Sequence, residues 1–119
     1  MNDKLVLIIE DDRDISLFFS TILKSAGFRV EIVFDGMAAE KRLGEIVPDV
    51  VVLDLHLPLV GGILLLRQIR ADVRLSQTRV LVTTANDSLI NVVKDDADTI
   101  LIKPISIRQL LLAVEQLLA

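Results

Sequence analysis

Short apolar runs alternate with amphipathic segments along the whole chain. Five runs are rich in Val, Ile and Leu and are too short for helices, so they predict buried β-strands. The expected strands are Leu5–Ile9, Val30–Val33, Val50–Leu53, Val80–Thr83 and Thr99–Ile102. Each of them is followed by a stretch in which apolar residues recur at helical spacing.

These intervening stretches predict five helices. They are expected around 15–23, over Met37–Ile46, Gly62–Arg70 and Ser88–Lys94, and from Ser106 to about Leu118. The last helix has the clearest start, because Ser106 and Gln109 have the spacing of a capping box. The fourth has the weakest pattern. A (βα)₅ order predicts an α/β, doubly wound fold, in which helices cover both faces of a five-stranded parallel sheet.

Composition narrows the class of protein. The 119 residues fit one domain, 1–119, and 52% of them are hydrophobic, with a mean hydropathy of +0.58. The longest apolar stretch, Leu57–Leu66, has ten residues and contains Pro58, whereas a membrane-spanning helix needs about 20. The apolar run before Glu10 is also too short for a signal peptide. We therefore expect a cytoplasmic protein without a membrane partner, whose strands are buried on both faces.

Charge and cysteine content exclude several kinds of site. The chain has no cysteine, which excludes disulfides, thiolate zinc sites and cysteine nucleophiles. Its net charge is −4, and its Lys and Arg residues are scattered rather than clustered. Because binding to nucleic acid needs a basic face, we expect no nucleic acid partner for this domain itself.

Polar residues follow four of the five predicted strands. Glu10–Asp12 come after the first strand, Asp54 after the third, Thr83–Thr84 close the fourth, and Lys103 follows the fifth. The carboxyl ends of parallel strands meet at one edge of the sheet, where ligands bind in such folds. Crowded carboxylates repel one another unless a cation lies among them. Hard oxygen ligands of this kind suit Mg²⁺.

Each of these residues also has a plainer interpretation. Asp12 has the position of a helix N-cap, and Asp54 that of a turn residue before Pro58. Thr84 fits an ordinary strand-end hydroxyl, and Lys103 a solvated loop lysine. Their joint placement at the ends of different strands favours a common site.

The same residues carry a resemblance to a known family. Over nearly its whole length the chain resembles the receiver domain of bacterial response regulators. The matching motifs are Ile8-Ile9-Glu10-Asp11-Asp12, Asp54-Leu55-His56-Leu57-Pro58 with Gly62, Val82-Thr83-Thr84-Ala85 and Ile102-Lys103-Pro104. The resemblance implies a flavodoxin-like three-layer sandwich with strand order 2-1-3-4-5 and a cis proline after Lys103.

The resemblance also implies a role for each residue. Asp54 would be the phosphoacceptor and a ligand of Mg²⁺, together with Asp11, Glu10 (partly through water) and the backbone carbonyl of His56. Thr84, rather than Thr83, would be the switch hydroxyl, because Ala85 follows it. Lys103 would pair with the phosphoryl oxygens, and with Asp54 in the unphosphorylated form. The His56 imidazole would line the entrance of the site and tune hydrolysis of the aspartyl phosphate.

Partners follow from the same resemblance. The phosphoryl donor would be a phosphohistidine on a sensor histidine kinase or a phosphotransfer protein. The output would be a protein partner or effector domain, with a homodimer as another possibility. The domain would be a signalling module rather than an enzyme, although it assists its own phosphorylation and dephosphorylation.

The chain departs from the family pattern on the output side. Ile100 occupies the place of an aromatic residue three positions before the lysine, and the stretch 85–103 is short at the expense of the fourth helix. We therefore expect switching to proceed through residues 85–98.

Three other functions compete with this prediction. A flavin- or nucleotide-binding protein of the same architecture would need a phosphate-cradling loop after the first strand, where this chain has acidic residues. A phosphatase or dehalogenase would need a second Asp two residues after Asp54, and this chain has His56 there. A receiver-like module that works without phosphorylation stays open.

Overall fold

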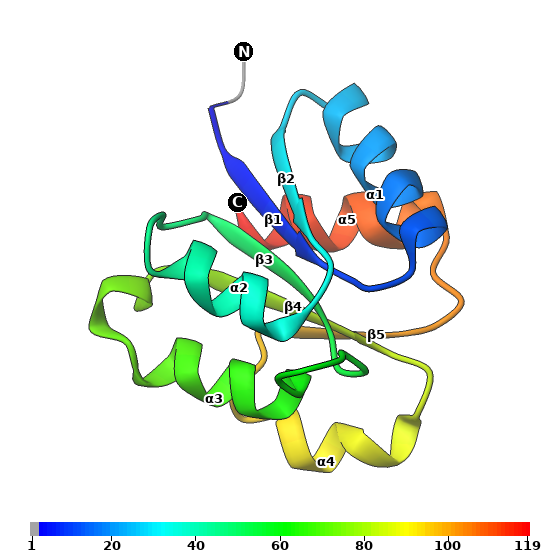
Figure 1. The fold of residues 1–119 in the computed structure, drawn as a ribbon. Coiled ribbons are helices and arrows are strands. Elements are labelled where there is room, and N and C mark those ends of the chain that lie inside the picture. The colour runs from blue at the N-terminus through cyan, green and yellow to red at the C-terminus, as the bar shows by residue number, and fades with distance from the viewer. Residues whose placement is uncertain (1–2) are drawn as a thin grey trace.

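A five-stranded parallel sheet forms the centre of the computed structural model, which describes residues 3–119 (Figure 1). The strands are β1 (Leu5–Ile9), β2 (Arg29–Val33), β3 (Val50–Asp54), β4 (Arg79–Thr84) and β5 (Thr99–Ile102). Their order is β2-β1-β3-β4-β5, and every neighbouring pair is parallel. The predicted fold class and strand order are confirmed, and the predicted strand bounds are correct to within one residue.

Helices cover both faces of this sheet. They are α1 (Arg13–Ser25), α2 (Gly36–Leu43), α3 (Gly62–Ala71), α4 (Ile90–Val93) and α5 (Ile107–Leu117), with 3₁₀ turns at η1 (Val73–Leu75) and η2 (Asp87–Leu89). Helices α1 and α5 lie on one face, and α2, α3 and α4 on the other (Figure 1). Between residues 3 and 119, no helix has both the length and the apolar character that crossing a bilayer requires.

Alternate residues of each strand belong to two separate cores. On β1, Val6 and Ile8 pack with α1 and α5, whereas Leu7 and Ile9 pack with α2 and α3. All four side chains are fully buried. This explains the unbroken apolar runs of the sequence, because a strand covered on both faces has no solvent-facing side.

The helix starts follow from local capping. The Asp12 side chain accepts hydrogen bonds from the backbone N–H groups of Asp14 (2.9 Å) and Ile15 (3.0 Å), so Asp12 is the N-cap of α1. The predicted capping box of α5 is present, with Ser106 Oγ accepting from Gln109 N and Gln109 Oε1 accepting from Ser106 N. Each contact satisfies backbone donors that a helix leaves unpaired at its start.

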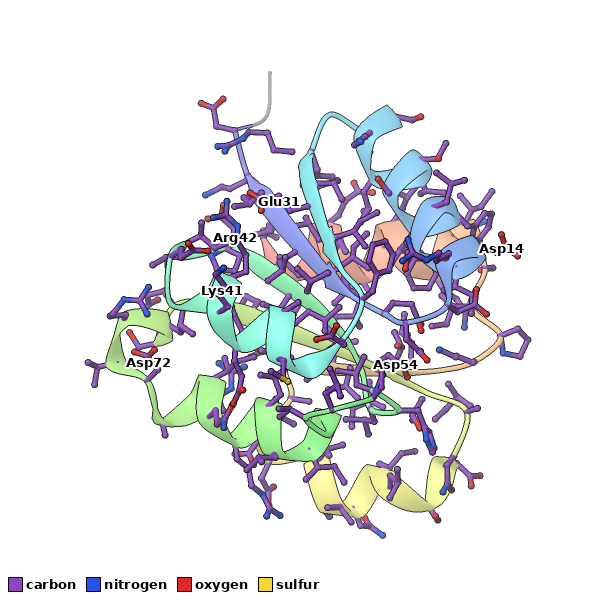
Figure 2. The ribbon with its side chains drawn as sticks, in the orientation of Figure 1. Asp14, Glu31, Lys41, Arg42, Asp54 and Asp72 are labelled. Carbon is purple, nitrogen blue, oxygen red and sulfur yellow. The ribbon has the colours of Figure 1, made fainter. Side chains whose placement is uncertain are left out.

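Helix α2 ends three residues earlier than predicted and begins one residue earlier. It ends at Leu43, and its last carbonyl group accepts hydrogen bonds from the Arg74 guanidinium, which also binds the carbonyl of Ile46. A second arginine ties this helix to the sheet edge, because Arg42 on α2 forms two hydrogen bonds with Glu31 on β2, at 2.7 and 3.0 Å (Figure 2). Neither of these long-range contacts could be predicted from the sequence pattern.

The fourth helical segment is as short as the sequence predicts. The 3₁₀ turn η2 and the four residues of α4 together replace a full helix. A helix this short is unstable alone, and Arg70 on α3 holds its far end. The guanidinium donates to the carbonyl of Asp96 (2.6 Å), the carbonyl of Thr78 (2.9 Å) and the carboxylate of Asp98 (2.5 Å). Movement of residues 85–98 on switching stays a prediction.

The loop between β3 and α3 leads away from Asp54 through a close backbone approach at Gly62. A Cβ atom on Gly62 would lie 2.5 Å from Leu55 Cα and 2.7 Å from the Asp54 carbonyl oxygen. Since both are backbone atoms, a side chain here would displace the chain that carries Asp54.

We expect Gly62→Ala to lower the free energy of unfolding by about 1–3 kcal/mol, the usual cost of overpacking. Urea denaturation measures this change. Gly44→Ala is the matched control, because its Cβ would meet neighbours at 3.4 Å and beyond and should change stability by less than about 0.5 kcal/mol. Equal stability of the two variants would contradict the close approach.

Candidate phosphoryl-acceptor and metal site

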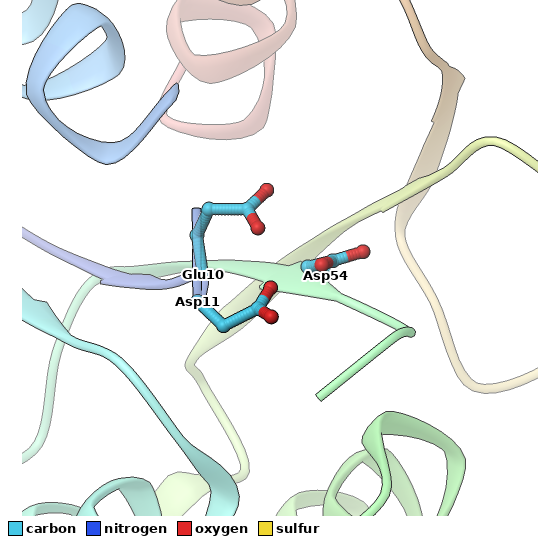
Figure 3. Close-up of side chains that lie close together, drawn as sticks. All are labelled: Glu10, Asp11 and Asp54. Carbon is cyan, nitrogen blue, oxygen red and sulfur yellow. The ribbon is translucent and has the colours of Figure 1, made fainter. Parts of the chain in front are cut away.

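Three carboxylates lie together at the carboxyl edge of the sheet. Asp54 is the last residue of β3, and Glu10 and Asp11 directly follow the neighbouring strand β1. One ligand oxygen from each of the three can be chosen so that all lie within 4.8 Å of one another (Figure 3). The sequence predicts this convergence, and the structure brings the three residues together.

Burial differs within the cluster. Glu10 and Asp54 are only 2% and 3% exposed, whereas Asp11 is exposed to solvent. Buried carboxylates need compensating charge or hydrogen bonds, because removing them from water is costly. The cluster therefore has a closed inner side, formed by Glu10 and Asp54, and an outer side at Asp11.

Lys103 supplies positive charge to the inner side. Its Nζ lies 2.7 Å from Glu10 Oε1 and 3.5 Å from Asp54 Oδ1. The predicted pairing of Lys103 with Asp54 is thus present, but the shorter contact is to Glu10. One ammonium group shared by two buried carboxylates leaves an excess of negative charge at this edge.

Burial, more than this imbalance, determines the protonation of the inner side. Burial raises the pKa of Glu10 to about 7, and the neighbouring Asp54 carboxylate adds to the rise, while the Lys103 ammonium opposes it. Burial acts to lower the pKa of Lys103, but its hydrogen bond to Glu10 and the charge of Asp54 outweigh this effect and raise it. Lys103 therefore stays charged at neutral pH, where Glu10 holds a proton part of the time.

Backbone groups near Asp54 also belong to the site. His56 donates its backbone N–H to Asp54 Oδ1 at 3.2 Å, and the residue itself is exposed. Its carbonyl oxygen forms no hydrogen bond among those found in residues 3–119. The peptide bond between Lys103 and Pro104 is cis, as the resemblance implies.

The two threonines at the end of β4 have different surroundings. Thr84 is fully buried, and its hydroxyl accepts a hydrogen bond from the backbone N–H of Asn86 at 3.0 Å. Thr83 is 1% exposed, and its hydroxyl has no partner among the described residues. The sequence predicts no role for Thr83, since nothing in the motif indicates that its hydroxyl is left without a partner.

Comparison with known proteins agrees with this geometry. The model of the response regulator receiver domain family matches residues 6–115. The DNA-binding dual master transcriptional regulator RpaA of Synechocystis sp. is 34% identical over 116 residues, which are 95% of this chain and 48% of RpaA. The chain spans about half the length of the curated relatives it matches.

Solved structures give the same result. The receiver domain of the Francisella response regulator 1452 is 30% identical, with a TM-score of 0.87 over 97% of this chain and 96% of that one. Chemotaxis response regulator CheY4 of Vibrio cholerae is 25% identical, with a TM-score of 0.88 over 98% of this chain and 99% of that one. The fold, the acidic cluster and the family match lead to one conclusion: this chain belongs to the receiver domains of response regulators, the signalling domains of two-component systems.

Proposed function

We propose that Asp54 is the phosphoacceptor of this domain and that Glu10, Asp11 and Asp54 bind a Mg²⁺ ion beside it. The observation that carries the proposal is the cluster itself, with three carboxylates around one edge and a single ammonium group, that of Lys103, between two of them. Phosphoryl transfer needs positioning and charge neutralisation more than covalent help from the protein.

The donor set fits a hard divalent cation. All three side chains offer carboxylate oxygens, the ligands that Mg²⁺ prefers, and exposed Asp11 leaves an open side for water. We add the backbone carbonyl of His56 as a further ligand. When bound, the ion would offset negative charge on the carboxylates and on an incoming phosphoryl group.

The remaining steps of phosphoryl transfer involve residues of the chain itself. A carboxylate oxygen of Asp54 forms the bond to phosphorus while the bond from phosphorus to the donor's imidazole nitrogen breaks, and the electron pair returns to that ring. The backbone N–H of His56 and the ammonium of Lys103 already lie 3.2 and 3.5 Å from Asp54 Oδ1 and stabilise charge there. The hydroxyl of Thr84 would rotate from Asn86 toward the new phosphoryl oxygens and so report phosphorylation.

A hollow beside Lys103 supports the proposed donor, a sensor histidine kinase or a phosphotransfer protein. It has a volume of about 410 Å³ and lies between α1 and the segment after β5, with Phe18, Pro104 and Ile105 among its lining residues. Apolar surface next to a charged site suits a protein that presents its phosphohistidine on an apolar helix. The net charge of −4 argues against a nucleic acid partner for these residues.

Incubation with acetyl phosphate and Mg²⁺ should add one phosphoryl group to the protein, and hydroxylamine should remove it. Asp54→Asn should abolish this labelling, because an amide oxygen is a poor nucleophile. Asp95→Asn, which changes an exposed carboxylate away from the site, should label like the wild type. Intact-protein mass spectrometry measures the change, and labelling of Asp54→Asn at the wild-type rate would disprove the assignment.

The raised pKa of Glu10 predicts how pH affects metal-free stability. Because the folded state holds this proton up to about pH 7 and the unfolded state only to about 4.5, the contribution of Glu10 to stability is fully present below about pH 4.5. It is lost as pH rises toward 7, and it amounts to a few kcal/mol at most. Melting in EDTA between pH 5 and 8 should show this decline in the wild type but not in Glu10→Gln.

Addition of Mg²⁺ should reverse the trend. The ion competes with the Glu10 proton, so its stabilisation of the fold should grow as pH rises through 7. Asp11→Asn should remove most of this stabilisation. Parallel metal-free pH profiles for the wild type and Glu10→Gln would contradict the raised pKa of Glu10. A melting temperature indifferent to millimolar Mg²⁺ would count against the metal site.

A further inference from the structure

Thr83 has a buried hydroxyl without a partner, next to the phosphoacceptor. Its side chain is 1% exposed, and within residues 3–119 its Oγ1 is the buried side-chain atom for which no hydrogen bond is found. Buried polar groups are almost always hydrogen-bonded, and a lone hydroxyl costs free energy that a valine of the same shape would not. A partner that this hydroxyl acquires in another state of the site would offset this cost.

The sheet register places Thr83 in the same row as the two buried carboxylates. Thr83 pairs directly with Asp54, and Ile9 pairs with Leu53, so Glu10 and Asp54 are level as well. Paired residues of neighbouring strands point to the same face of a sheet. Glu10, Asp54 and Thr83 thus form one row across β1, β3 and β4, on the face that α1 and α5 cover.

Thr84 belongs to the other face. Consecutive residues of a strand point to opposite sides, and the Thr84 hydroxyl is engaged by the backbone of Asn86. In the unphosphorylated domain the two hydroxyls therefore have different surroundings, and the switch role proposed for Thr84, at the end of β4, does not account for Thr83.

Lys103 reaches its partners across this row. It follows β5, an edge strand of the sheet, and shares the face of Leu101, which pairs with Thr83. Its Nζ nevertheless contacts Glu10 beyond β1 and Asp54 on β3. Because β4 lies between β5 and β3, the lysine side chain passes over the end of β4, where Thr83 and Ala85 share its face. An ammonium group has three N–H donors, and its hydrogen bond to Glu10 Oε1 occupies one of them.

We propose that Thr83 is a positioning residue for Lys103, whose Oγ1 accepts a hydrogen bond from the ammonium group when this moves from Glu10 to the phosphoryl oxygens on Asp54. The inference rests on the proposed phosphorylation of Asp54. New negative charge on β3 draws the ammonium back from β1 toward β4, where the Thr83 hydroxyl lies. The move gives the hydroxyl a partner and fixes the ammonium against the phosphoryl group.

Thr83→Val and Thr83→Ser test this role. Val keeps the shape and removes the hydroxyl, whereas Ser keeps the hydroxyl and removes the methyl group. A hydrogen bond to a charged group corresponds to about a tenfold change or more in an equilibrium constant. We expect Thr83→Val to bind beryllofluoride with Mg²⁺ about tenfold more weakly than the wild type, and Thr83→Ser to stay within about threefold of it. Thermal melting across a beryllofluoride titration measures the affinity without relying on turnover.

A double-mutant cycle with Lys103→Ala separates positioning from packing. If Thr83 acts through the ammonium, Thr83→Val should not weaken beryllofluoride binding any further once the Lys103 ammonium is absent. The unliganded stability of Thr83→Val should equal or exceed that of the wild type, because a lone hydroxyl has been removed.

Three results would overturn the inference. Thr83→Val could bind beryllofluoride as tightly as the wild type, Thr83→Val and Thr83→Ser could weaken binding equally, or Thr83→Val could weaken binding just as much in the Lys103→Ala background. Failure of the proposed function gives a different result. The wild type would then neither take up phosphoryl from acetyl phosphate nor bind beryllofluoride, or Asp54→Asn would do both as well as the wild type.

Discussion

The contact between the Lys103 ammonium and two buried carboxylates holds the functional edge of this domain together. Glu10 and Asp54 lie side by side at the ends of neighbouring strands, almost without exposure to water. Without a cation, this pair would be costly to bury. Lys103 reaches both from the far side of the sheet, at 2.7 and 3.5 Å, and thereby links the first, third and fifth strands at the point where chemistry is proposed.

The rest of the fold serves this arrangement. Full burial of β1 and β3 on both faces fixes their register, because a shift of one residue would exchange the two cores. The same register brings Glu10 level with Asp54 and places Thr83 beside them. Gly62 allows the chain to leave Asp54 through a close backbone approach. Precision at the site is thus a consequence of the packing of the sheet.

Much of this could be predicted from the sequence, because the deciding signals are local. Apolar runs predict the strands, Ser106 and Gln109 predict the start of α5, and the polar residues after the strands predict the acidic cluster. The strand order came from the family resemblance rather than from periodicity. The early end of α2, the closer approach of Lys103 to Glu10 than to Asp54, and the lone hydroxyl of Thr83 could not be predicted. Each depends on how far a side chain reaches across the assembled sheet, which a linear pattern does not contain.

Before phosphorylation, the shared Lys103 ammonium offsets the negative charge of the acceptor Asp54. The site should therefore rearrange in one defined way after phosphorylation. A crystal structure of the domain with Mg²⁺ and beryllofluoride tests this most directly. We expect beryllium on a carboxylate oxygen of Asp54 and Mg²⁺ among Glu10, Asp11 and Asp54. The Lys103 ammonium should lie on a fluorine atom, no longer within hydrogen-bonding distance of Glu10. Any one of three results would contradict this expectation: Lys103 still bound to Glu10, the beryllofluoride group elsewhere, or the metal away from these carboxylates.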